Sequence, residues 1–146
     1  MKRIAAAAVI IMAVVGGILL IHHRNMKPSV TIDSNKIGVE IANTESSREL
    51  GLGNRNSLSA GRGMLLTFDK PGDYGFWMKD MRFNIDIIWI SADKKIVTVA
   101  ADVSPSSYPK AFHSTDLAQY VLEVNAGYAA GHNFKAGDQV KFTGVE

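Results

Sequence analysis

The sequence contains no cysteine among its 146 residues. Disulfide bonds, a cysteine nucleophile and a lipid-modified cysteine anchor are therefore excluded. The chain also lacks the Gly-x-Ser-x-Gly turn of serine hydrolases and the Gly-x-x-x-x-Gly-Lys loop that binds phosphate. Its four histidines form no ligand pattern, because His22 and His23 adjoin an apolar run and His113 and His132 stand alone. We therefore expect neither a metal ion nor a cofactor.

The first 29 residues contain no acidic residue, and most of them are apolar. Residues 4–21 form an unbroken run of 18 apolar and small residues. As a helix, this run spans roughly 27 Å, close to the thickness of the hydrocarbon core of a bilayer. We predict that residues 1–28 are an uncleaved transmembrane anchor followed by a short linker. The alternative is a cleaved signal peptide, although such peptides usually have a shorter apolar core.

The charges beside this run indicate its orientation. Lys2, Arg3 and the terminal amine precede the run, whereas Arg24 and Lys27 follow it. This small excess favours a cytoplasmic N-terminus. Residues 29–146 are therefore expected to form a single domain outside the cytoplasm, tethered to the cell membrane or, if the segment is cleaved, secreted.

The domain itself is weakly acidic. All 14 Asp and Glu lie after residue 29, whereas four of the 16 Lys and Arg lie beside the apolar run, which leaves 12 basic residues in the domain. Its formal charge is therefore −2, and the basic pI of about 8.9 comes from the N-terminal segment. A nucleic-acid-binding surface needs clustered Lys and Arg, so we expect no nucleic acid as a partner.

Short apolar segments separated by turn residues dominate the domain. Val, Ile and aromatic residues are enriched in these segments, as is typical of strands. Many short strands and few helices predict a mainly β fold, a compact antiparallel sheet that is curled or barrel-like. The expected strands are residues 30–32, 37–41, 63–68, 76–78, 85–90, 96–103, 120–124 and 139–142.

Two short helices and one turn are expected between these strands. Thr44 is a suitable N-cap for a helix that Gly51 ends. Asn125 is the expected cap of a second helix that runs through Ala130. Residues 69–73 contain proline and glycine and predict a turn.

Two carboxylates lie inside apolar strand segments. Asp86 stands between two isoleucines, and Glu123 stands between a leucine and a valine. Burial of an unpaired charge is costly, so each group must be hydrogen-bonded, paired or protonated. We favour an architectural role, in which the carboxylates accept backbone N–H groups or pair with an arginine. The alternative is a general acid/base pair in one pocket, with Arg48 or Arg55 holding an anionic ligand.

Both tryptophans of the chain lie between residues 76 and 90. Aromatic and methionine side chains at this density usually build a core. Trp77 and Met78 would instead line a pocket if Lys79 and Asp80, which follow them, form an exposed rim.

Five motifs follow one another in order over residues 30–143. They are Arg48-Glu49-Leu50-Gly51-Leu52 with Arg55, Gly63-Met64-Leu65, Phe76-Trp77-Met78-Lys79-Asp80-Met81, Asp86-Ile87-Ile88-Trp89-Ile90, and Tyr120-Val121-Leu122-Glu123-Val124 with Gly127. This series resembles the domain of unknown function 192 family. The resemblance implies a compact, mostly β, barrel-like prokaryotic domain that is often exported or membrane-tethered, and it implies no established activity.

We therefore expect a membrane-tethered binding or accessory module of the cell envelope. Its expected partners are the membrane, through residues 4–21, and a small ligand or an envelope protein. The alternative is a small hydrolase or lyase-like enzyme that uses Asp86 and Glu123. The candidate binding residues are Arg48, Arg55, Trp77, Met78, Lys79, Asp80, Asp86 and Glu123.

Overall fold

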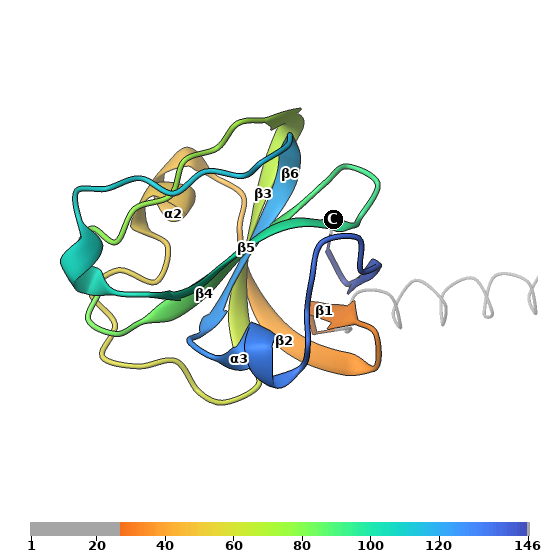
Figure 1. Ribbon diagram of the computed structural model, residues 1–146, viewed down its shortest axis with the longest axis horizontal. Helices are drawn as coiled ribbons and strands as arrows, with labels where there is room; N and C mark the ends of the chain where they lie inside the picture. The colour runs from red at the N-terminus through yellow and green to blue at the C-terminus, as the bar shows by residue number, and fades with distance from the viewer. Residues whose placement is uncertain (1–26, 146) are drawn as a thin grey trace, which may run out of the picture.

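The computed structural model describes residues 27–145, and in this part of the chain seven strands form one sheet that two short α-helices accompany (Figure 1). The elements in chain order are β1 (Ser29–Ile32), β2 (Asn35–Ala42), α2 (Glu45–Leu50), β3 (Arg62–Gly72), β4 (Ile85–Ile90), β5 (Ile96–Val103), the 3-10 helix η1 (Pro105–Ser107), β6 (Ala118–Asn125), α3 (Tyr128–Gly131) and β7 (Val140–Thr143).

The strands lie in the order β5-β4-β6-β3-β2-β1-β7. Neighbouring strands are antiparallel except β2 and β3, which are parallel and are connected through α2. The two edge strands approach each other at one end, because Lys95 pairs with Gln139 and the Ile96 N–H donates to the Asp138 carbonyl at 3.0 Å. The sheet therefore curls into a half-barrel, which confirms the predicted mainly β, curled fold.

Alternating side chains divide the core into two clusters, one on each face of the curled sheet. Ile88 and Leu122 belong to the first cluster, and Ile87, Trp89 and Val121 belong to the second. α3 packs on the first cluster, and the loop that follows α2 packs on the second. Figure 1 shows α2 and α3 at different sides of the sheet.

α2 is capped at both ends. The Ser47 N–H donates to Thr44 Oγ1 at 3.2 Å, and the Thr44 N–H donates to Ser47 Oγ at 3.0 Å. Gly51 ends the helix with a φ of 51°, a left-handed value that glycine adopts at little cost. The helix predicted after Thr44 is therefore confirmed, as are the two hairpins β1–β2 and β4–β5.

The predicted boundaries around β3 are wrong. β3 continues through residues 69–72, where the sequence predicts a turn, because after an irregularity in register Gly72 pairs with Ala118 of β6. Residues 76–78 form no strand, and only Phe76 pairs, with Phe112. Pairing with distant residues decides both outcomes.

The predicted cap of the second helix is also wrong. Asn125 is the last residue of β6, and its Nδ2 donates to the Leu58 carbonyl at 2.9 Å. α3 begins after Gly127, which has a φ of 80°.

The predicted membrane anchor, residues 4–21, lies outside the described residues. From residue 27 to residue 145, the structure contains no helix with the length and apolar character needed to cross a membrane. The first strand begins at Ser29, where the predicted domain begins.

Candidate functional site

Asp86 is fully buried and bonded to the backbone. Its Oδ1 accepts the N–H groups of Asp102 at 2.8 Å and Gly127 at 3.1 Å, and its Oδ2 accepts the N–H of Ala129 at 2.8 Å. These bonds join β4 to the end of β5 and to the start of α3. Asp86 therefore has the architectural role that the sequence favours.

The register of β4 and β6 separates the two buried carboxylates. Asp86 stands opposite Val124, whereas Glu123 stands opposite Ile87. Paired residues of antiparallel strands point to the same face of a sheet, and neighbours along a strand point to opposite faces. Asp86 and Glu123 therefore lie on opposite faces and form no acid/base pair.

Glu123 lies on the face of the second cluster and is only 6% exposed. Among the described residues, its Oε2 has no hydrogen-bond partner. Burial raises the pKa of Glu123 to about 7, although the backbone N–H of Leu52 and the charge of Arg55 act in the opposite direction. A carboxyl group in this state can donate or accept a proton near neutral pH.

Glu123 lines a cavity of about 410 Å³. α2 and the loop after it form one side of this cavity, and the segment from Asp73 to Lys79 forms the other. Gly51 lies against the Glu123 carboxylate, because a Cβ at this position would stand 3.3 Å from Oε2. A smaller cavity of about 220 Å³ adjoins it and shares Glu49, Leu50 and Lys79.

Aromatic side chains form much of the cavity wall. Phe68 and Tyr74 are stacked with centroids 3.6 Å apart, and Phe76 meets Phe68 edge-on at 6.5 Å. Trp77 also lines the cavity and is 48% exposed. A large exposed aromatic side chain at the rim of a cavity is typical of ligand sites.

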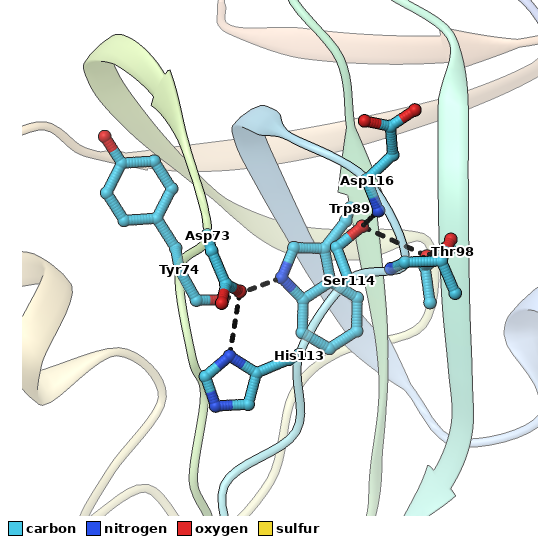
Figure 2. A network of polar contacts seen from close by, with 8 residues as sticks. Asp73, Tyr74, Trp89, Thr98, His113, Ser114 and Asp116 are labelled. Atoms are coloured by element: carbon cyan, nitrogen blue, oxygen red, sulfur yellow. Dashed lines mark hydrogen bonds and ion pairs between the residues drawn. The ribbon is translucent and has the colours of Figure 1, made fainter.

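Hydrogen bonds fix the segment that carries Tyr74, as Figure 2 shows. The Trp89 Nε1–H donates to the Tyr74 carbonyl at 3.0 Å, which ties the segment to β4. Asp73 Oδ1 lies 2.8 Å from His113 Nδ1, and this contact links the end of β3 to the segment before β6. The bond from Trp89 therefore attaches the wall of the cavity to the sheet, and the contact with His113 attaches it to the segment before β6.

Both candidate arginines already form hydrogen bonds within the domain. Arg48 Nη1 donates to the carbonyls of Asn43 at 2.8 Å and Thr67 at 2.9 Å, and its guanidinium lies 4.9 Å from the centroid of the Phe68 ring. Arg55 forms two 2.8 Å hydrogen bonds with the carboxylate of Glu40.

The structure brings together four of the eight candidate residues around the cavity of about 410 Å³, namely Arg48, Trp77, Lys79 and Glu123. Asp80 lines only the smaller cavity, Met78 is buried in the second cluster, and Asp86 lies on the other face. Sequence reasoning missed the cavity residues Phe68, Asp73 and Tyr74, because they follow no spacing that would distinguish them from core and turn residues.

Among residues 27–145, no group of three or more metal-ligating side chains has a suitable arrangement for a metal ion. The cavity beside Glu123 combines one buried carboxyl group with several aromatic side chains, which is typical of sites that bind small molecules.

The sequence profile of the domain of unknown function 192 family, described as "Uncharacterized ACR", matches residues 28–142. The chain belongs to this family. The match covers every described strand up to the third residue of β7. Among curated proteins, none matches the chain.

Two solved structures are similar to this member of the family. One is a protein of unknown function from Novosphingobium aromaticivorans DSM 12444, with 29% identity and a TM-score of 0.72 over 78% of this chain and 82% of that one. The other, from Sinorhizobium meliloti 1021, is described as a candidate transcription regulator; it has 28% identity and a TM-score of 0.74 over 81% of this chain and 93% of that one.

Proposed function

We propose that this domain is a small-ligand-binding module whose binding site is the cavity between α2 and the segment after β3. One observation carries the proposal: a buried carboxyl group, Glu123, lines an aromatic cavity, and its Oε2 has no hydrogen-bond partner in the described part of the chain. Unpartnered buried polar atoms are costly and are rare unless a ligand or water completes them.

Binding is supported better than catalysis by the same geometry. The acid/base alternative needs Asp86 and Glu123 in one cleft, and the sheet separates them. Asp86 is also saturated by three backbone N–H groups. Within residues 27–145, Glu123 therefore has no second buried carboxylate on its face of the sheet with which to share a proton.

Two matched leucines allow a direct test of the binding site. Leu50 lines the cavity and is 56% exposed, whereas Leu117 is 55% exposed and lies outside it. Leu50→Trp reduces the space in the cavity, while Leu117→Trp adds the same side chain elsewhere. Because both positions are exposed, we expect only small changes in stability.

The experiment is a thermal-shift screen of metabolites and glycans against the full chain in mild detergent. We expect compounds that raise the melting temperature of the wild type and of Leu117→Trp but not of Leu50→Trp. A screen in which every hit acts equally on both variants, or in which no compound binds, would contradict the proposal.

The same proposal places the domain on the outer side of the cell membrane, tethered through residues 4–21. The length of the apolar run and the charges beside it support this placement. Fractionation of cells that produce the full chain should recover an uncleaved product in the membrane, with the domain accessible to protease from outside the cytoplasm. A soluble product that begins near Gly17 would refute the tether.

A further inference from the structure

We infer that the cavity takes an organic cation, a protonated amine attached to a small apolar body. This inference rests on the proposed function and adds the chemical class of the ligand. Three features of the cavity lead to it: the sign of its charges, the aromatic side chains of its wall and the unpartnered oxygen of Glu123.

The charged side chains of the cavity wall are mostly acidic. In the part of the chain that the structure describes, the acidic residues Glu45, Glu49, Asp73 and Glu123 line the cavity, against the basic residues Arg48 and Lys79. Arg48 Nη1 already donates to two carbonyl oxygens, and Asp73 Oδ1 already contacts His113 Nδ1 at 2.8 Å. An anionic ligand would therefore meet a predominance of like charge, whereas a cation would meet opposite charge.

The aromatic part of the wall also favours a cation. A positive charge is attracted to the face of an aromatic ring, and tryptophan gives the strongest interaction. Trp77 lines the cavity with about half of its surface exposed, and Tyr74 stands on the same segment. The apolar body of the ligand would contact these rings and Leu50.

The unpartnered oxygen of Glu123 supplies the third argument. Glu123 Oε2 accepts no hydrogen bond from residues 27–145, and the side chain is more than nine-tenths buried. A protonated amine carries both the N–H donor that this oxygen lacks and the charge that a buried carboxylate needs. A quaternary ammonium provides the charge without the donor, so it should bind less well.

The two tryptophans of the chain can report where a ligand binds. The indole N–H region of a ¹⁵N-edited NMR spectrum should therefore contain two signals. Trp77 lies at the cavity, whereas Trp89 is buried and donates to the Tyr74 carbonyl. A ligand in the cavity should move the Trp77 signal much more than the Trp89 signal.

The experiment titrates the full chain in mild detergent at pH 8 with four probes of similar shape. The probes are phenethylamine, benzyltrimethylammonium, 2-phenylethanol and 3-phenylpropionate. We expect saturable binding of phenethylamine at Trp77, weaker binding of the quaternary cation and the alcohol, and the weakest binding of the carboxylate. Glu123→Gln, which removes the charge and keeps the shape, should weaken phenethylamine binding by about tenfold or more. Asp93→Asn, at an exposed position away from the cavity, is the matched control and should bind like the wild type.

The remaining outcomes separate this inference from the proposed function. Equal or stronger binding of the alcohol or the carboxylate at Trp77 would overturn the cation and leave the binding module intact. Phenethylamine binding that is unchanged in Glu123→Gln would also overturn it. If no probe moves the Trp77 signal, the inference of an organic cation is wrong. The thermal-shift screen with Leu50→Trp and Leu117→Trp then tests separately whether the cavity binds any small ligand.

Discussion

The two buried carboxylates of this domain differ in almost every respect except burial. Asp86 accepts three backbone N–H groups and joins three elements on one face of the sheet. Glu123 lies on the other face, borders a cavity and has an oxygen that no described residue contacts through a hydrogen bond. The hydrogen bonds of Asp86 stabilise the fold, whereas the burial of Glu123 without a full set of partners destabilises it. Destabilisation of this kind is typical of a functional site.

The two surroundings explain this difference. Asp86 faces the first cluster, where the start of α3 and the end of β5 present N–H groups at hydrogen-bond distance. Glu123 faces the second cluster, where the loop after α2 covers it and the aromatic segment after β3 leaves space.

Replacement of Asp86 should have the largest effect. Asp86→Ala leaves three buried backbone N–H groups without an acceptor, so we expect the free energy of unfolding to fall by about 3–5 kcal/mol. Urea unfolding followed by circular dichroism would measure the loss. Asp86→Asn keeps one acceptor oxygen and should lose less. A loss below about 1 kcal/mol in Asp86→Ala would show that these bonds are not architectural.

Replacement of Glu123 should raise the free energy of unfolding at high pH, whereas replacement of Asp86 lowers it. The pKa of Glu123 is about 7 in the folded chain against an ordinary value of 4.5. Below about pH 4.5 the carboxyl group is protonated in both the folded and the unfolded state, so folding buries no charge at Glu123. As the pH rises from about 4.5 to about 7, the unfolded state ionises while the folded state stays protonated, and the folded state loses roughly 3 kcal/mol of stability.

Glu123→Gln should remove this loss. We expect the variant to be more stable than the wild type at pH 8 by up to about 3 kcal/mol and to differ much less at pH 4. Urea unfolding of both proteins at several pH values would measure the difference. Equal pH dependence of the two proteins would mean that Glu123 is not the group that titrates.

Arg48 should have a moderate effect, because it connects α2 to the sheet below the cavity. Arg48→Met keeps an apolar chain over the Phe68 ring but removes the hydrogen bonds to the Asn43 and Thr67 carbonyls. We expect a loss of about 1–2 kcal/mol in urea unfolding. Amide hydrogen exchange should also become faster in α2 than in β6, and an equal change in both elements would contradict this local role.

Arg55 should have the smallest effect on stability. Its pair with Glu40 is partly exposed, with 35% and 48% of the two side chains accessible, so Arg55→Gln should cost less than about 1 kcal/mol. The charge of Arg55 lowers the pKa of Glu123, so its removal should move the titration of Glu123 to higher pH. Carboxyl NMR would detect this shift, and a shift to lower pH would contradict the placement of the charge.

Local signals account for the parts of the fold that the sequence predicts. Thr44 and Gly51 lie at the ends of one short helix, and their side-chain and backbone preferences suffice to place it. The alternation in residues 96–103 and the adjacent turn likewise predict the β4–β5 hairpin. The role of Asp86 follows from its apolar neighbours, since a carboxylate among isoleucines needs partners.

The cavity could not be predicted in the same way. It exists because residues 73–79 lie over the sheet opposite α2, and this position depends on the bond from Trp89 to the Tyr74 carbonyl and on the contact between Asp73 and His113. These partners are 15 and 40 residues apart in sequence. The extension of β3 through Gly72 has the same origin, because pairing with Ala118 overrides the local turn preference.

A site-resolved titration of the Glu123 carboxyl carbon by ¹³C NMR tests the contrast between the two carboxylates most directly. The full chain in mild detergent, labelled at glutamate, would be followed from acid to alkaline pH, with Glu123→Gln assigning the signal. The structure predicts a midpoint at about 7, because burial without a complete set of hydrogen bonds disfavours the charged form. A midpoint near the ordinary value of 4.5 would show that Glu123 is solvated or paired, and would contradict its role as the unpartnered acid of a binding site.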